Sequence, residues 1–182
     1  HGQGRAAAVG TSVVRRLRHL GFDVLAIAGR DGPDASAQVA AALQAPRVQA
    51  LIAVGGDGMV HLAANAVAGG PQTLGIVAAG GGNDFARLLG LPLGDPHAAV
   101  RSLLSNQVRS VDCGKAGGVW FAGVCSAGFD AAVNERANRM RVLPGRVKYD
   151  VAMIAELKDF RPIPMTIHVD NVPVQKDVML VA

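Results

Sequence analysis

The sequence predicts an α/β fold in which a parallel sheet covered by helices is followed by the start of a β-rich part. Up to about residue 106, short apolar runs alternate with stretches whose apolar residues recur at helical spacing. After that point, shorter strand-like runs dominate. A chain of 182 residues, 50% hydrophobic and 18% charged, is long enough for one domain or slightly more and too apolar to be disordered.

The first part predicts a Rossmann-like domain. Val9, Val13 and Leu17 recur at helical spacing before Gly21, a typical helix stop, so a helix is expected over residues 5–20. Continuous apolar runs predict strands buried on both faces, as in a parallel sheet between helices. Strands are expected over residues 22–28, 48–54 and 73–78, and further helices over residues 34–44, 58–68, 84–89 and 98–104.

The second part predicts shorter strands interrupted by two helices. Its strands are expected over residues 109–113, 119–124, 165–169 and 178–181, and its helices over residues 130–140 and 147–160. The boundary between the parts is placed near Asn106, which gives one domain over residues 1–106 and another over residues 107–182. The chain starts at His1 without an initiator Met, so we expect it to be part of a longer protein.

Composition excludes several classes of protein. No apolar run approaches the roughly 20 residues of a membrane-spanning helix. Two cysteines without metal-ligand spacing fit a reducing, cytoplasmic setting. The net charge of +4 suits an anionic ligand or surface, but the few aromatic residues do not alternate with basic ones, which argues against a nucleic-acid partner.

Gly55-Gly56-Asp57-Gly58 follows directly on a predicted strand and precedes a predicted helix. Glycines let the backbone approach a ligand closely, and the free N–H groups at a helix start attract anions. Asp57 would repel a bare phosphate, so the pattern makes most sense if a divalent cation bridges Asp57 and a nucleotide phosphate. The alternative is that the glycines only turn the chain and Asp57 caps the helix.

A second glycine turn, Gly80-Gly81-Gly82, leads into Asn83 and Asp84, about one strand and helix further along the chain. Both acids should therefore lie at the carboxyl ends of neighbouring parallel strands, where open α/β sheets bind ligands. Asn83 and Asp84 could also act as helix caps. The chain lacks the Walker phosphate loop and the dinucleotide fingerprint, so neither a Walker-type nucleotidase nor a dinucleotide-dependent oxidoreductase is expected.

These motifs resemble the lipid kinases that include bacterial diacylglycerol kinases and sphingosine kinases. The most specific part is Gly-Asn-Asp-Phe-Ala-Arg over residues 82–87; residues 55–58, 111–112, 126–130 and 145–149 also match. The resemblance implies a diacylglycerol kinase-like or NAD kinase-like fold and ATP and Mg²⁺ as cofactors. It implies nucleotide binding in residues 1–106, whose first strand is missing, and lipid binding in the incomplete residues 107–182. Gly-Gly-Asp-Gly alone is shared with NAD kinases and phosphofructokinases.

The resemblance also implies the roles of individual residues. Asp57 would assist deprotonation of the lipid hydroxyl and hold magnesium through MgATP, with Asp112 in a supporting network. The expected nucleotide-binding residues are Gly2, Gly4, Arg5, Gly55, Gly56, Asp57, Gly58, Met59, Gly80, Gly81, Gly82, Asn83 and Asp84. The family acid thought to be the general base is expected outside this chain.

Two positions depart from the family pattern, because Gly81 and Met59 each replace a usual Thr. Each change removes a hydrogen-bond partner typically worth about 0.5–1.5 kcal/mol, so weaker ATP binding is expected. Five basic residues and no acid lie between Arg136 and Lys148. They either dock on anionic lipid headgroups or form an ordinary solvated surface.

The sequence therefore predicts a kinase that transfers the ATP γ-phosphate to the hydroxyl of diacylglycerol or a related lipid alcohol, as in phospholipid metabolism. Its expected partners are ATP, a lipid alcohol, a peripheral anionic membrane surface and a second copy in a homodimer. The alternatives are an NAD kinase-like small-molecule kinase and a lipid- or nucleotide-binding domain without catalysis.

Overall fold

The computed structural model describes residues 3–105, 107–140, 145–169 and 172–182. The chain divides into two compact units, His1–Gly123 and Val124–Ala182, and each is described by itself. Among the described residues, no helix is both long and apolar enough to cross a bilayer.

The first unit is built on two parallel strands, β1 (Ala50–Gly55) and β2 (Thr73–Ala78). They pair in register from Ala50 opposite Thr73 to Gly55 opposite Ala78. The helices of this unit are α1 (Gln3–His19), α2 (Gly32–Leu43), α3 (Asp57–Val67), α4 (Asp84–Leu88) and α5 (Pro96–Leu104). This is the expected α/β domain with a parallel sheet.

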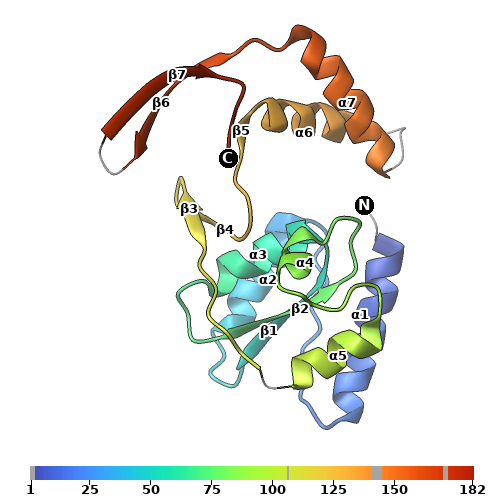
Figure 1. Ribbon diagram of the computed structural model, residues 1–182. Helices are drawn as coiled ribbons and strands as arrows, with labels where there is room; N and C mark the ends of the chain where they lie inside the picture. The colour runs from blue at the N-terminus through green and yellow to red at the C-terminus, as the bar shows by residue number, and fades with distance from the viewer. Residues whose placement is uncertain (1–2, 106, 141–144, 170–171) are drawn as a thin grey trace. The chain divides into compact units, whose positions relative to one another are not determined.

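Helices cover both faces of this sheet (Figure 1). On one face, Val77 of β2 is buried with residues of α1 and α5: Val13, Leu17, Ala99 and Val100. On the other face, Ile76 and Ala78 are buried with residues of α3 and α4: Val60, Phe85 and Ala86. Successive residues of β2 thus point to opposite helical layers, which explains why residues 74–78 are apolar.

An antiparallel hairpin of β3 (Gly114–Ala116) and β4 (Val119–Phe121) ends the first unit. Its turn, Gly117-Gly118, has positive φ at both residues, 54° and 84°, as a two-residue turn between strands requires. The strand before the turn begins at Gly114, whereas the sequence predicted a strand over residues 109–113. That prediction is wrong because the turn fixes the register of β3 against β4.

The strand expected over residues 22–28 is also absent, although the segment is described. Phe22 is 51% exposed and Leu25 69% exposed, whereas Val24 packs at the border of the core. No strand within the described ranges pairs with this segment. An apolar run becomes a strand only when a neighbour accepts its backbone hydrogen bonds, so the composition alone misled here.

The second unit contains β5 (Ala127–Gly128), α6 (Phe129–Arg139), α7 (Gly145–Asp159), β6 (Ile163–Val169), β7 (Val172–Val178) and β8 (Leu180–Val181). β6 and β7 form an antiparallel pair, as do β5 and β8. Ala137 of α6 and Ala152 of α7 are fully buried, so small side chains allow the two helices to pack closely. The two helices and the β-rich character agree with the sequence-based expectation.

Candidate active site

The two glycine turns meet at one edge of the parallel sheet. β1 ends at Gly55, and α3 begins two residues later at Asp57; β2 ends at Ala78, and α4 begins at Asp84. The N–H of Ala79 donates to the carbonyl of Gly55 over 2.9 Å, which continues the pairing of the strands into the loops. The carboxyl ends of β1 and β2 therefore deliver both loops to the same place, as the sequence predicted.

Direct backbone contact holds the loops together. A Cβ built on Gly56 would lie 3.1 Å from the Cα of Gly80, and a Cβ built on Gly80 would overlap the Cα of Gly56. A side chain at Gly80 would therefore force the loops apart. By contrast, Cβ atoms built on Gly58 and Gly81 meet nothing within 4 Å, so these two glycines border open space.

Asn83 closes the second loop on itself. It adopts the left-handed conformation (φ 58°, ψ 40°), which Asn tolerates better than most residues. Its Nδ2 donates to the carbonyl of Gly80, and its Oδ1 accepts from the N–H of Gly80, both over 2.9 Å. Asn83 occupies the N-cap position of α4, but its side chain bonds back to the loop instead of capping the helix.

Asp57 links the two loops. Its Oδ1 accepts a hydrogen bond from the N–H of Phe85, in the first turn of α4, over 3.2 Å. A Cβ built on Gly82 would lie 2.9 Å from Oδ2 of Asp57 and 3.4 Å from Oδ2 of Asp84. Two carboxylates, each from the first residue of the helix after one of the neighbouring strands, thus border the same small space beside Gly82. Asp57 is half-buried and Asp84 is exposed.

Arg87 supports the second loop from α4. Its Nη2 donates to the carbonyl of Gly82 over 2.9 Å. The guanidinium of Arg87 thus has a backbone carbonyl of the loop as its partner. The side chain is exposed.

The remaining predicted site residues lie in different surroundings. Gly2 lies outside the described residues. Gly4 and Arg5 lie in the first turn of α1. The side chain of Arg5 reaches Gly94, because a Cβ built on that glycine would lie 3.5 Å from Nη2 of Arg5. Met59 is 40% exposed, and its Cβ would lie 2.8 Å from a Cβ on Gly55. Asp112 is exposed, and within the described part of the chain it has no hydrogen bond or ion pair, so its place in the network stays a prediction.

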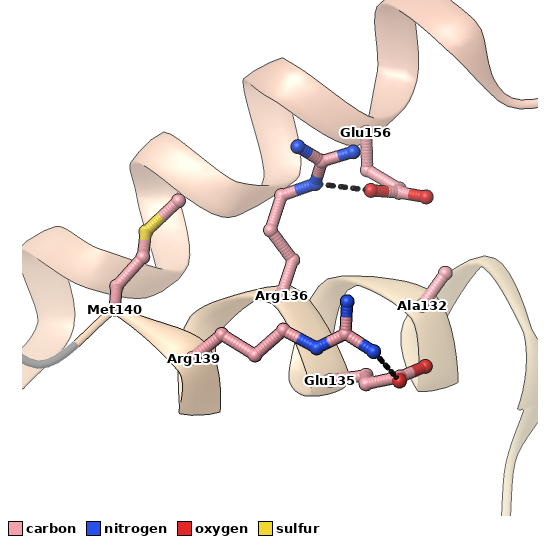
Figure 2. A pocket seen from close by; sticks show the side chains of 6 residues that line it. All are labelled: Ala132, Glu135, Arg136, Arg139, Met140 and Glu156. Carbon is pink, nitrogen blue, oxygen red and sulfur yellow. Dashed lines mark hydrogen bonds and ion pairs between the residues drawn. The ribbon is translucent and has the colours of Figure 1, made fainter.

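The basic stretch belongs to the second unit and is partly neutralised there. Arg136 pairs with Glu156 of α7, and Arg139 pairs with Glu135 one turn earlier. Figure 2 shows both pairs among the side chains that line a pocket. The volume of this pocket is about 380 Å³. Arg141 lies outside the described residues. With two arginines facing two glutamates, this cavity is not an obvious anion site.

Sequence reasoning missed Asn65, the residue that ties the hairpin to α3. Its side chain makes two hydrogen bonds of 2.8 Å to the backbone of Trp120, 55 residues along the chain. The available signal was an amide in an otherwise apolar stretch of α3, next to the buried Ala64 and near the buried Val67. Its partner could not be read from the sequence.

Known proteins share both parts of the chain. The family described as diacylglycerol kinase catalytic domain matches residues 1–116. The family described as YegS C-terminal NAD kinase beta sandwich-like domain matches residues 123–182. The diacylglycerol kinase of Mycobacterium tuberculosis (strain ATCC 25618 / H37Rv) is 41% identical over 175 residues, which cover 93% of this chain and 56% of that protein.

Two further relatives agree. The diacylglycerol kinase of Bacillus subtilis (strain 168) is 29% identical over 71% of this chain and 44% of that protein. The crystal structure of a diacylglycerol kinase from Bacillus anthracis str. Sterne superposes with a TM-score of 0.70 at 26% identity, covering 98% of this chain and 58% of that one. The chain spans about half the length of the curated relatives it matches. The first family match covers both glycine loops and more than half of this chain. The chain therefore belongs to the diacylglycerol kinase catalytic domain family.

Proposed function

We propose that this chain carries the nucleotide-binding part of an ATP-dependent lipid kinase. The enzyme transfers the γ-phosphoryl group of ATP to the hydroxyl of diacylglycerol or a related lipid alcohol. The observation that supports this most is the position of Asp57, whose carboxylate bonds to the start of α4 and so joins two glycine loops at one sheet edge. Membership of the family agrees with the same chemistry.

The loops provide the kind of site that a triphosphate needs. α3 is an 11-residue helix whose first turn points its free N–H groups toward the sheet edge. The open space at Gly58 and Gly81 leaves room for phosphates to approach the backbone. Phosphoryl transfer depends mainly on positioning and charge neutralisation, which backbone N–H groups and a cation supply without covalent help.

The residues present fit a magnesium ion that arrives with ATP. Asp57 and Asp84 offer carboxylate oxygens, which Mg²⁺ prefers, beside the same glycine. No group of three or more metal-ligating side chains gathers among the residues with described positions. Two carboxylates nevertheless suit Mg²⁺, which usually keeps several waters and binds phosphate oxygens as well. Bound there, the ion neutralises phosphate charge.

Asp57 has a free oxygen for a second role. Oδ1 is engaged by the N–H of Phe85, whereas within the described residues Oδ2 accepts no hydrogen bond. Oδ2 lies on the side of Gly82, next to Asp84. We propose that this oxygen orients the ligands of the site and assists deprotonation of the lipid hydroxyl, together with a base outside this chain.

The test is phosphate transfer by the full-length gene product from labelled ATP, with magnesium, to diacylglycerol, a sphingoid base and NAD. Asp57→Asn keeps an oxygen for the N–H of Phe85 but removes the charge, so lipid phosphorylation should fall at least about 100-fold with little change in melting temperature. Asp23→Asn, an exposed residue of the same unit, is the matched control.

Each outcome separates the candidate functions. Transfer to a lipid alcohol that depends on Asp57 supports the proposal and identifies the acceptor. Transfer to NAD would make the protein an NAD kinase instead. ATP binding without transfer to any acceptor would favour a non-catalytic domain, and near-normal turnover in Asp57→Asn would refute the role of Asp57.

Three further expectations belong to the same proposal. We propose that residues 1–106 bind nucleotide and residues 107–182 bind lipid, that the protein works as a homodimer, and that it docks on the cytoplasmic face of an anionic membrane. The paired state of Arg136 and Arg139 leaves less free positive charge for docking than the sequence suggested. Flotation with phosphatidylglycerol and phosphatidylcholine vesicles tests the docking, and light scattering tests the dimer.

A further inference from the structure

Asn65 makes an unusual connection between a helix and a hairpin of the first unit. From α3, its Oδ1 accepts from the N–H of Trp120 and its Nδ2 donates to the carbonyl of Trp120, each over 2.8 Å. Nδ2 also donates to the carbonyl of His61, one turn earlier, over 2.9 Å. Both N–H donors of the amide are therefore used. Asn65 and Trp120 are both half-buried.

The hairpin geometry explains why Trp120 needs this partner. The two-residue turn makes Ala116 and Val119 the hydrogen-bonded closing pair, so Lys115 and Trp120 form the next, non-hydrogen-bonded pair. The N–H and carbonyl of Trp120 then point away from β3. Asn65 takes the place that a neighbouring strand would occupy and satisfies both groups.

The same side chain connects two places that matter for the reaction. α3 begins at Asp57, eight residues or roughly 12 Å before Asn65 along the helix. β4 ends at Phe121, and the first unit ends at Gly123. Asn65 therefore joins the helix of the first glycine loop to the last strand of the first unit.

The glycine loops have contacts of their own. Gly80 is held by Asn83, Asp57 is bound to Phe85, and Gly56 contacts Gly80 directly. None of these contacts involves the hairpin. A change at Asn65 should therefore leave the nucleotide loops intact while it releases β4.

We infer that Asn65 is a positioning residue for the lipid substrate in the proposed reaction, and this inference rests on the proposed lipid kinase function. It holds β4, which belongs to the residues 107–182 proposed to bind lipid, against α3, so that this strand keeps a fixed place relative to Asp57 within the first unit. Its loss impairs use of the lipid and spares ATP.

The experiment compares Asn65→Ala, the milder Asn65→Gln and the control Gln38→Ala in the full-length gene product. Gln38 is exposed in α2, and its Nε2 donates to Asp34 one turn earlier, so its loss tests for a general effect of removing an amide from a helix of the first unit. The readouts are the Kd for ATP, kcat/KM for the lipid, hydrogen exchange of the Trp120 N–H, and Trp120 emission, isolated by comparison with Trp120→Phe.

In Asn65→Ala, protection of the Trp120 N–H should fall roughly 5- to 160-fold, as expected for two lost hydrogen bonds. Lipid kcat/KM should fall at least about tenfold, while the Kd for ATP stays within about twofold of that of the unaltered protein. Asn65→Gln should give values between those of the unaltered protein and of Asn65→Ala. It provides the same test if Asn65→Ala does not fold.

Two results would overturn the inference. In one, protection of Trp120 is lost but lipid kcat/KM stays within about twofold; in the other, ATP binding and lipid use decline by the same factor, as they would in a loosened fold. An unaltered protein that phosphorylates no lipid would instead refute the proposed function. The Trp120 exchange and emission would then still report whether Asn65 holds β4.

Discussion

Gly80→Ala tests the close approach of the two glycine loops most directly. The added methyl group would overlap the Cα of Gly56 and lie 2.9 Å from the Gly56 nitrogen, in backbone that cannot rotate away. It would also lie 3.0 Å from Oδ1 of Asn83, which accepts the Gly80 N–H. The two loops must therefore separate to make room.

Gly80→Ala is expected to lower both the stability of the fold, through overpacking, and the affinity for ATP, through displacement of the loops. Inserting a methyl group into a packed site costs about 1–3 kcal/mol of stability, and a chain of this size loses about 2–4 °C of melting temperature per kcal/mol. We expect the melting temperature to fall by about 2–12 °C. If the displaced loops lose one N–H bond to a phosphate oxygen, worth about 1.5–3 kcal/mol, ATP affinity falls roughly 10- to 150-fold.

Gly81→Ala is the matched control, because it adds the same atom one residue later where nothing lies within 4 Å. It should change stability by less than about 0.5 kcal/mol. Calorimetric titration with MgATP and thermal unfolding of both variants are the assays. If Gly80→Ala bound ATP and unfolded like the unaltered protein, the close approach of Gly56 and Gly80 would not be a feature of the site.

Two further changes test single features of the first unit. Gly81→Thr adds a hydroxyl where the space is open. ATP should then bind about 2- to 13-fold more tightly, the equivalent of one hydrogen bond. Gly81→Val adds the bulk without the hydroxyl and should give no gain in ATP affinity. Asp95 caps α5, and the bond from the Ala98 N–H, the largest influence, lowers the pKa of its carboxyl. Because the lowered pKa favours folding only while the carboxyl is ionised, the melting temperature lost in Asp95→Ala should be largest near neutral pH and shrink as the pH falls below about 4. An equal loss at pH 7 and pH 3 would contradict this role of the charge.

The sequence predicted the parallel strands and their helices well because each element has its own local signal. β1 and β2 are uninterrupted apolar runs that end in glycine turns, and the apolar residues of α1 recur at helical spacing before Gly21. The same rule failed for residues 22–28, which are apolar apart from Asp23 but lack a paired neighbour in the described chain. A strand is a property of two segments, so one segment cannot establish it.

The candidate site was predictable at the level of which loops meet, and less so at the level of what each side chain does. That Asp57 and Asp84 would share a sheet edge followed from the topology of parallel strands. That Asn83 bonds back to Gly80, and that Asp57 bonds to the N–H of Phe85, depends on loop conformations that no sequence pattern specifies. The link from Asn65 to Trp120 depends on a hairpin register fixed 55 residues away.

The glycines of the site fall into two groups, and the difference indicates where a ligand can approach. Gly56 and Gly80 are glycines because the two loops touch there, so their lack of a side chain serves the protein itself. Gly58 and Gly81 border open space, and nothing in the described chain requires a missing side chain at either position. Glycine in the first turn of a helix lowers stability relative to alanine unless close approach of the backbone is useful. In the proposed kinase, Gly58 in the first turn of α3 therefore marks a side from which phosphates would reach the loops.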